Sequence, residues 1–122
     1  MQTRLDYGKA APGSVQAIYK LQKYVDESGL EHSLLELVKT RVSQMNGCAF
    51  CIDMHTKDAR AAGETEQRPY GLSAWAEAPY YSDRERAVLA WAEVVTNVSQ
   101  THASDEEYEA HVRSSARRSW SG

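Results

Sequence analysis

Apolar residues recur at intervals of three and four along most of this 122-residue chain, and this spacing is typical of one face of an α-helix. A first helix is expected to begin at Pro12 and to end at Gly29. Its apolar series is Val15, Ile18, Leu21 and Val25. Because no segment shows the strict alternation of a half-buried strand, the sequence predicts an all-α fold.

The second predicted helix runs from about Glu31 to Met45 and stops at Asn46-Gly47, because both of these residues tolerate positive φ. Its expected buried residues are Leu34, Leu37, Val38 and Val42. A third helix is predicted from near Gly47 to Gly63.

Start signals predict the helices of the second half. A short helix follows Thr65, with Pro69 in or just past its first turn, where proline is tolerated. Residues 82–85 and 104–107 have the pattern of capping boxes, and each is expected to open a helix. The chain would then hold about five or six helices in one compact domain, residues 1–113, followed by an atypical tail, residues 114–122.

Charge and hydropathy exclude several classes of function. The formal net charge is −3 and the basic residues are scattered, whereas a nucleic-acid-binding protein normally carries a basic patch. No run approaches the roughly 18 apolar residues of a membrane span. The polar start lacks the apolar core of a signal peptide. We therefore expect a cytoplasmic protein that binds neither nucleic acid nor a membrane.

The only two cysteines, Cys48 and Cys51, form a C-x-x-C motif. A secreted disulfide-stabilised domain would carry more cysteines at wider spacing. In a reducing cytosol, a close pair indicates redox catalysis or part of a metal site. Burial as small apolar residues is the third possibility.

His55 extends this motif. On a helix, Cys48 and Cys51 are three residues apart and Cys51 and His55 are four apart, so all three project from one face. Cys48 falls in the first turn, where the helix dipole favours a thiolate. His55 lies one turn from Cys51, whose proton it could accept. We favour Cys51 as the nucleophile because a general base acts only within hydrogen-bond reach.

Two alternatives remain open. Two thiolates and an imidazole are three zinc ligands, and Glu36 or an oligomer partner could complete a structural or regulatory zinc site. The chain could also be a redox-inert assembly protein. Redox chemistry is favoured over metal binding because no second C-x-x-C and no spaced pair of histidines completes a metal site.

The chain reads ELVKTRVSQMNGCAFCIDMH from Glu36 to His55 and continues TKDARAAGE. This segment resembles the core of the AhpD-like alkylhydroperoxidases, within the carboxymuconolactone decarboxylase superfamily. The glutamate, the Asn-Gly pair, both cysteines and the histidine fall in register. The match is specific over residues 36–63 and looser over residues 5–112. The founding members carry a histidine where this chain has Phe50.

The resemblance implies an all-α homo-trimer or homo-hexamer that reduces a small-molecule hydroperoxide with an external thiol reductant. It implies that Cys51 attacks the peroxide, that Cys48 resolves the product, and that Glu36 and His55 relay protons. We expect no cofactor and no catalytic metal. Lactone decarboxylation is not expected, because the decarboxylase branch lacks the paired cysteines.

The remaining histidines and the aromatic residues of the segment around Trp75 are not expected to take part in chemistry. His32, His102 and His111 are expected at the surface. Core or subunit-interface packing is expected of Trp75, Tyr80 and Tyr81.

The tail has no helical periodicity. Residues 115–121 can be encoded so that a shift of one base reads Phe-Ser-Glu-Lys-Glu-Leu-Val, a capped helix start similar to the one that opens the family's next helix. We therefore hypothesise that a frameshift replaced the family's C-terminal helix, which would be missing here. The redox motif lies upstream and would survive.

Overall fold

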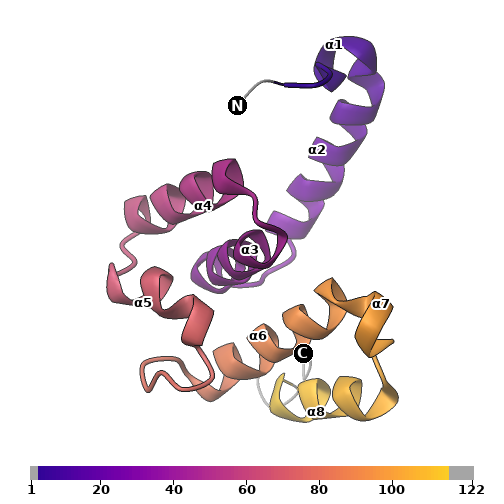
Figure 1. Cartoon of the computed structure of the whole chain (residues 1–122). Coiled ribbons are helices and arrows are strands. Elements are labelled where there is room, and N and C mark those ends of the chain that lie inside the picture. Colours follow the sequence, from indigo (N-terminus) through magenta and orange to yellow (C-terminus); the bar gives the residue numbers. More distant parts are fainter. Residues whose placement is uncertain (1–2, 116–122) are drawn as a thin grey trace. The chain divides into compact units, whose positions relative to one another are not determined.

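The computed structural model describes residues 3–115, and within that range every regular element is a helix (Figure 1). The long helices are α2 (Pro12–Asp26), α3 (His32–Asn46), α4 (Ala49–Ala61), α6 (Asp83–Thr96) and α8 (Asp105–Ser115). The short ones are α1 (Tyr7–Ala10), α5 (Gln67–Tyr70), the 3-10 helix η1 (Gly71–Ala74) and α7 (Val98–Thr101). The all-α prediction is confirmed.

Local signals set most of the long helices. Pro12 begins α2, and the capping box at Ser82 is complete, because the Ser82 hydroxyl accepts from the Glu85 N–H and the Glu85 carboxylate accepts from the Ser82 N–H. Ser104 likewise accepts from the Glu107 N–H before α8. The last helix continues through Ser115, two residues into the predicted atypical tail. The frameshift hypothesis otherwise concerns residues that lie outside the described range.

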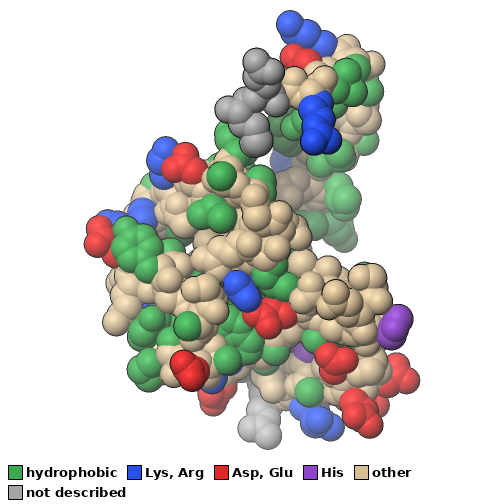
Figure 2. All heavy atoms as spheres, viewed as in Figure 1, with side chains coloured by type: hydrophobic (Ala, Val, Ile, Leu, Met, Phe, Trp, Pro, Cys, Tyr) green, Lys and Arg blue, Asp and Glu red, His purple; other side chains and the backbone are tan. Residues whose placement is uncertain are grey.

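The chain divides into two compact units, residues 1–32 and residues 33–122. The first unit contains α1 and α2, and neither helix has a buried residue. The apolar series of α2 is present, yet Ile18 and Leu21 are 65% and 64% exposed. Figure 2 shows hydrophobic side chains at the surface of this unit.

The core of the second unit is small and centres on Leu37, Leu72, Tyr81 and Leu89. Trp75 and Tyr80 pack against it, so of the two places expected for the aromatic cluster, the core or a subunit interface, the structure shows packing at the core. Gly71 leaves room for the Tyr80 ring, because a Cβ at that position would lie 2.0 Å from the Tyr80 hydroxyl oxygen and the ring would have to move.

The face that α3 buries differs from the prediction. Leu34 and Leu37 are buried as expected, but Val38 and Val42 are only half-buried. Thr40 and Ser43 are buried instead. Their hydroxyls donate to backbone carbonyls one turn earlier, at 2.7 and 2.6 Å, and these bonds satisfy the buried polar atoms.

Arg68 organises the polar side of this core. Its Nε donates to Glu64 at 2.9 Å, its Nη1 donates to the Tyr80 carbonyl at 2.7 Å, and its guanidinium pairs with Glu85. Hydrogen bonding to Glu85 raises the pKa of Arg68. Burial opposes ionisation of Glu85, but the bonds from Arg68 and Ser82 outweigh burial and lower the pKa of Glu85. The network therefore holds α5 against the start of α6.

Replacing Arg68 by alanine is expected to lower the free energy of unfolding by about 3 kcal/mol, because the two carboxylates and the carbonyl lose their shared donor in a partly buried place. Urea unfolding measures the loss. The control is Arg60→Ala, which breaks an exposed pair with Glu66 and should cost less than about 1 kcal/mol. Equal losses in the two variants would contradict this role for Arg68.

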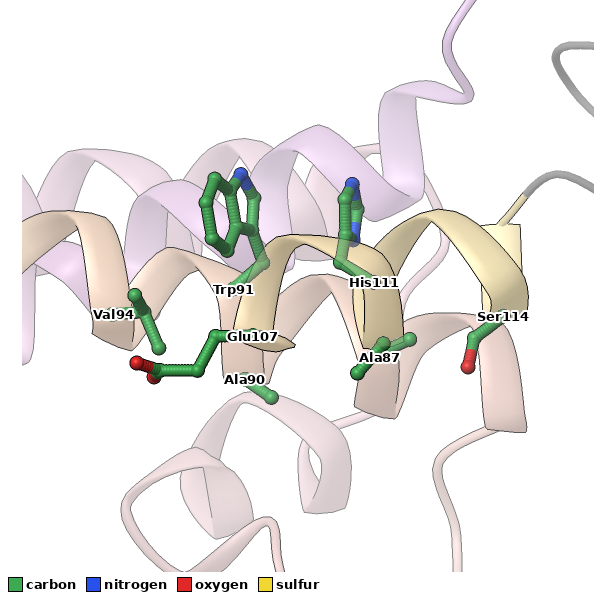
Figure 3. Close-up of a pocket in the computed structure, with 8 residues that line it drawn as sticks. Ala87, Ala90, Trp91, Val94, Glu107, His111 and Ser114 are labelled. Carbon is green, nitrogen blue, oxygen red and sulfur yellow. The ribbon is translucent and has the colours of Figure 1, made fainter. Parts of the chain in front are cut away.

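Helices α6 and α8 pack side by side (Figure 1). Between them lies an open pocket of about 230 Å³, with Trp91, Glu107 and His111 among its lining residues (Figure 3). The expectation that His111 is exposed is wrong. Its ring stacks on Trp91 with ring centroids 5.6 Å apart, and burial lowers its pKa. His32 and His102 are exposed, as expected.

Among residues 3–115, no helix is both long enough and apolar enough to span a membrane.

Candidate active site

The turn between α3 and α4 fixes the cysteines. Gly47 follows α3 with φ of 67°, a conformation that suits glycine. This turn makes Cys48 the N-cap of α4, and its sulfur accepts the Cys51 N–H at 3.3 Å. The sulfur of Cys48 therefore lies at the positive end of a thirteen-residue helix.

The two cysteines form a disulfide, with their Cα atoms 5.3 Å apart. This separation falls within the usual range for such a bond. Both residues are half-buried rather than enclosed in the core. In the disulfide neither sulfur is a thiolate, so the cysteine-based zinc site that the sequence allowed is not formed in this state.

Glu36 and His55 meet although nineteen residues separate them. The Nδ1 atom of His55 lies 3.1 Å from a carboxylate oxygen of Glu36, across α3 and α4. Glu36 is buried, with 4% of its surface exposed, and His55 is half-buried. A buried carboxylate at this distance fixes the orientation of the imidazole and can exchange a proton with it.

Hydrogen bonds to α6 hold α3, the helix that carries Glu36, in place. Arg41 on α3 donates to a Glu93 oxygen on α6 at 3.0 Å. The Trp75 indole donates to the same oxygen at 2.7 Å. Arg41 lies on α3 and Trp75 follows η1. The Glu93 carboxylate therefore links both of these segments to α6.

The structure adds one residue that the sequence analysis did not single out. Asp58 lies one turn beyond His55 on α4, and its carboxylate belongs to a cluster with Glu36 and His55 whose ligand atoms lie within 4.8 Å of one another. The only sequence signal for it is the three-residue spacing from His55, which is too common to be selective.

Two large apolar side chains of α4 that are close to the cysteines in sequence are exposed. Phe50, which stands between the cysteines, is 70% exposed, and Met54 one turn later is 39% exposed.

Comparison with known proteins shows the family to which the chain belongs. Residues 12–94 match the carboxymuconolactone decarboxylase family. The uncharacterized protein YdfG of Bacillus subtilis is 47% identical over 108 residues, which are 88% of this chain and 74% of that protein. The uncharacterized protein YnjA of Escherichia coli is 29% identical over 69 residues, 57% of this chain and 38% of that protein.

A crystal structure from Agrobacterium tumefaciens superposes with a TM-score of 0.87 at 43% identity, and covers 93% of this chain and 77% of that one. It is described as a protein of unknown function and a candidate antioxidant defence protein of the AhpD type. The family match covers both cysteines, Glu36 and His55. The chain therefore belongs to the carboxymuconolactone decarboxylase family, in its AhpD-like branch with the paired cysteines.

Proposed function

We propose that this chain is a thiol-dependent peroxidase that reduces hydroperoxides through Cys51 and Cys48, with His55 and Glu36 as a proton relay. The observation that carries the proposal is the Glu36–His55 contact at 3.1 Å, one helical turn from Cys51 in a C-x-x-C pair that forms a disulfide. Membership of the AhpD-like branch supports the same reaction.

In the first step the Cys51 thiolate attacks one oxygen of the peroxide O–O bond. That bond breaks, the sulfur is oxidised to a sulfenic acid, and the other oxygen leaves as an alcohol after it takes a proton from the relay. His55 accepts the proton of the Cys51 thiol before the attack and returns one to the leaving oxygen. Glu36 holds the imidazole in place and stabilises its charged form.

In the second step the sulfur of Cys48 attacks the Cys51 sulfenic acid. The S–O bond breaks, the hydroxyl leaves as water with the proton that the Cys48 thiol gives up, and the disulfide forms. Two equivalents of an external thiol then reduce the disulfide by exchange, and the chain returns to its dithiol form. The net reaction consumes one hydroperoxide and two thiols.

The direct test is peroxide consumption by the purified chain with defined reductants such as dithiothreitol. One equivalent of tert-butyl hydroperoxide should oxidise both thiols of the reduced chain, so that the number of titratable thiols falls from two to zero. Mass spectrometry should then place the disulfide between Cys48 and Cys51. Thiols that survive excess peroxide would contradict the proposal and favour the redox-inert assembly protein. Near-stoichiometric zinc bound to the reduced thiols would favour the zinc-protein alternative.

We also propose that the chain works as a homo-trimer or homo-hexamer. Among the described residues of the first unit, α2 buries none of its side chains, and Ile18 and Leu21 on its apolar face are about two-thirds exposed. A surface of this kind is costly in water and is typical of an interface between copies.

Leu21→Lys is accordingly expected to shift the chain from the oligomer toward the monomer, because a charge on the apolar face of α2 opposes its burial against another copy. Light scattering at micromolar concentration measures the mass. Gln16→Lys, on the opposite side of the same helix, is the matched control and should leave the oligomer intact. A monomeric unmodified chain would refute the assembly.

A further inference from the structure

The Glu36–His55 pair has a third member that the peroxidase mechanism does not use. Asp58 completes a cluster in which one ligand atom from each residue lies within 4.8 Å of the other two. Among residues 3–115, this is the cluster of histidine and acidic side chains that has the spacing of a metal site. We infer that Glu36, His55 and Asp58 bind a divalent transition-metal ion of the Zn²⁺ class.

The geometry is close to that of such a site. With bonds of about 2.0–2.1 Å, the ligand atoms of a tetrahedral zinc ion lie roughly 3.3–3.5 Å apart. Glu36 and His55 are already 3.1 Å apart, and burial fixes the Glu36 carboxylate. Asp58 is exposed, so its side chain can rotate to close the remaining distance.

The basic residues next to Asp58 on α4 pair with other carboxylates, which leaves the Asp58 carboxylate available to bind a metal ion. The two cations closest to it in sequence on α4 are engaged elsewhere, because Lys57 pairs with Asp53 at 2.8 Å and Arg60 pairs with Glu66 at 2.9 Å. Two carboxylates therefore converge on one imidazole, while the cations next to Asp58 on α4 pair with other carboxylates.

The donor set indicates which ion fits. An imidazole nitrogen favours zinc, copper, nickel or iron over magnesium, which prefers a shell of oxygen atoms. Three protein ligands also leave a position for water, as in zinc sites that are not purely structural. No sulfur takes part, so this site differs from the cysteine-based one and is available while the disulfide is intact.

The test uses the untagged, oxidised full chain, in which the cysteines cannot bind metal. Isothermal titration with ZnCl₂ is expected to show one equivalent bound, and MgCl₂ at the same concentration should show none. Asp58→Asn and Glu36→Gln should each weaken Zn²⁺ binding by more than about tenfold, since the loss of even an outer-shell partner costs roughly 10–100-fold.

Asp53→Asn is the matched control, because it removes the same charge from an exposed position of the same helix. It should bind Zn²⁺ as the unmodified chain does, and circular dichroism should show that all variants are folded. Equal affinity in Asp58→Asn and Asp53→Asn would overturn the site. Binding that appears only after reduction of the disulfide would also overturn it and would assign the metal to the cysteines. Because the readout is metal binding, failure here is separate from failure of the peroxidase proposal.

Discussion

Replacing Cys51 by serine is expected to abolish turnover of hydroperoxide, with a loss of more than about 1000-fold, because a hydroxyl at this position gives no thiolate to attack the O–O bond. The measurement is peroxide consumption with dithiothreitol as the reductant. The variant should retain the fold, since serine is smaller than cysteine and Cys51 is only half-buried.

Cys48→Ser is the matched comparison, because it removes the partner thiol of the same disulfide. It should still react once with peroxide, and a dimedone-type reagent should then trap a sulfenic acid on Cys51. Two features of the site favour different cysteines as the attacking thiolate. The start of α4 stabilises an anion on Cys48, whereas the His55 imidazole lies one turn from Cys51. If the trapped sulfenic acid is on Cys48 in the Cys51→Ser variant, the order of attack proposed here is reversed.

Glu36→Gln is expected to lower the rate of reaction with peroxide by roughly 100-fold, at the low end of what proton transfer by a positioned side chain contributes. The amide keeps the size of the side chain and can still bond to His55, but it cannot carry the negative charge that stabilises the imidazolium. Stopped-flow measurement of thiol loss gives the rate.

The pH dependence of that rate distinguishes a relay from a structural support. A relay residue changes the shape of the pH–rate profile when it is replaced, whereas a structural one lowers the rate equally at every pH. Glu31→Gln, at an exposed carboxylate just before α3, is the control and should match the unmodified chain. A Glu36→Gln profile that is parallel to the unmodified one would remove Glu36 from the relay.

The sequence by itself determined the features that depend on neighbours along the chain. The helical class follows from apolar spacing, and the start of α6 follows from the Ser82 capping box. Gly47 marks the turn before α4, because a backbone with φ of 67° favours glycine. The spacing of Cys51 and His55 along α4, one turn apart, likewise follows from the sequence, whereas the structure places Cys48 at the N-cap and not in the first turn of the helix. Each of these signals acts within about one helical turn, so no tertiary information is needed to read it.

The tertiary structure decided which residues from different helices meet. It brings Glu36 to His55 across nineteen residues and adds Asp58 to the pair, although the spacing of Asp58 carries no distinctive signal. It also stacks His111 on Trp91, where an exposed residue was expected. These outcomes depend on how whole helix faces pack, because burial is set by the partner surface and not by the residue alone.

The buried face of α3 illustrates the physical reason. Val38 and Val42 are the more apolar side chains, yet Thr40 and Ser43 take the buried positions. Their hydroxyls donate to carbonyls within the same helix, so burial costs them little. Only the packing of α3 against the other helices of the second unit determines that these hydroxyls, and the Glu36 carboxylate, are buried.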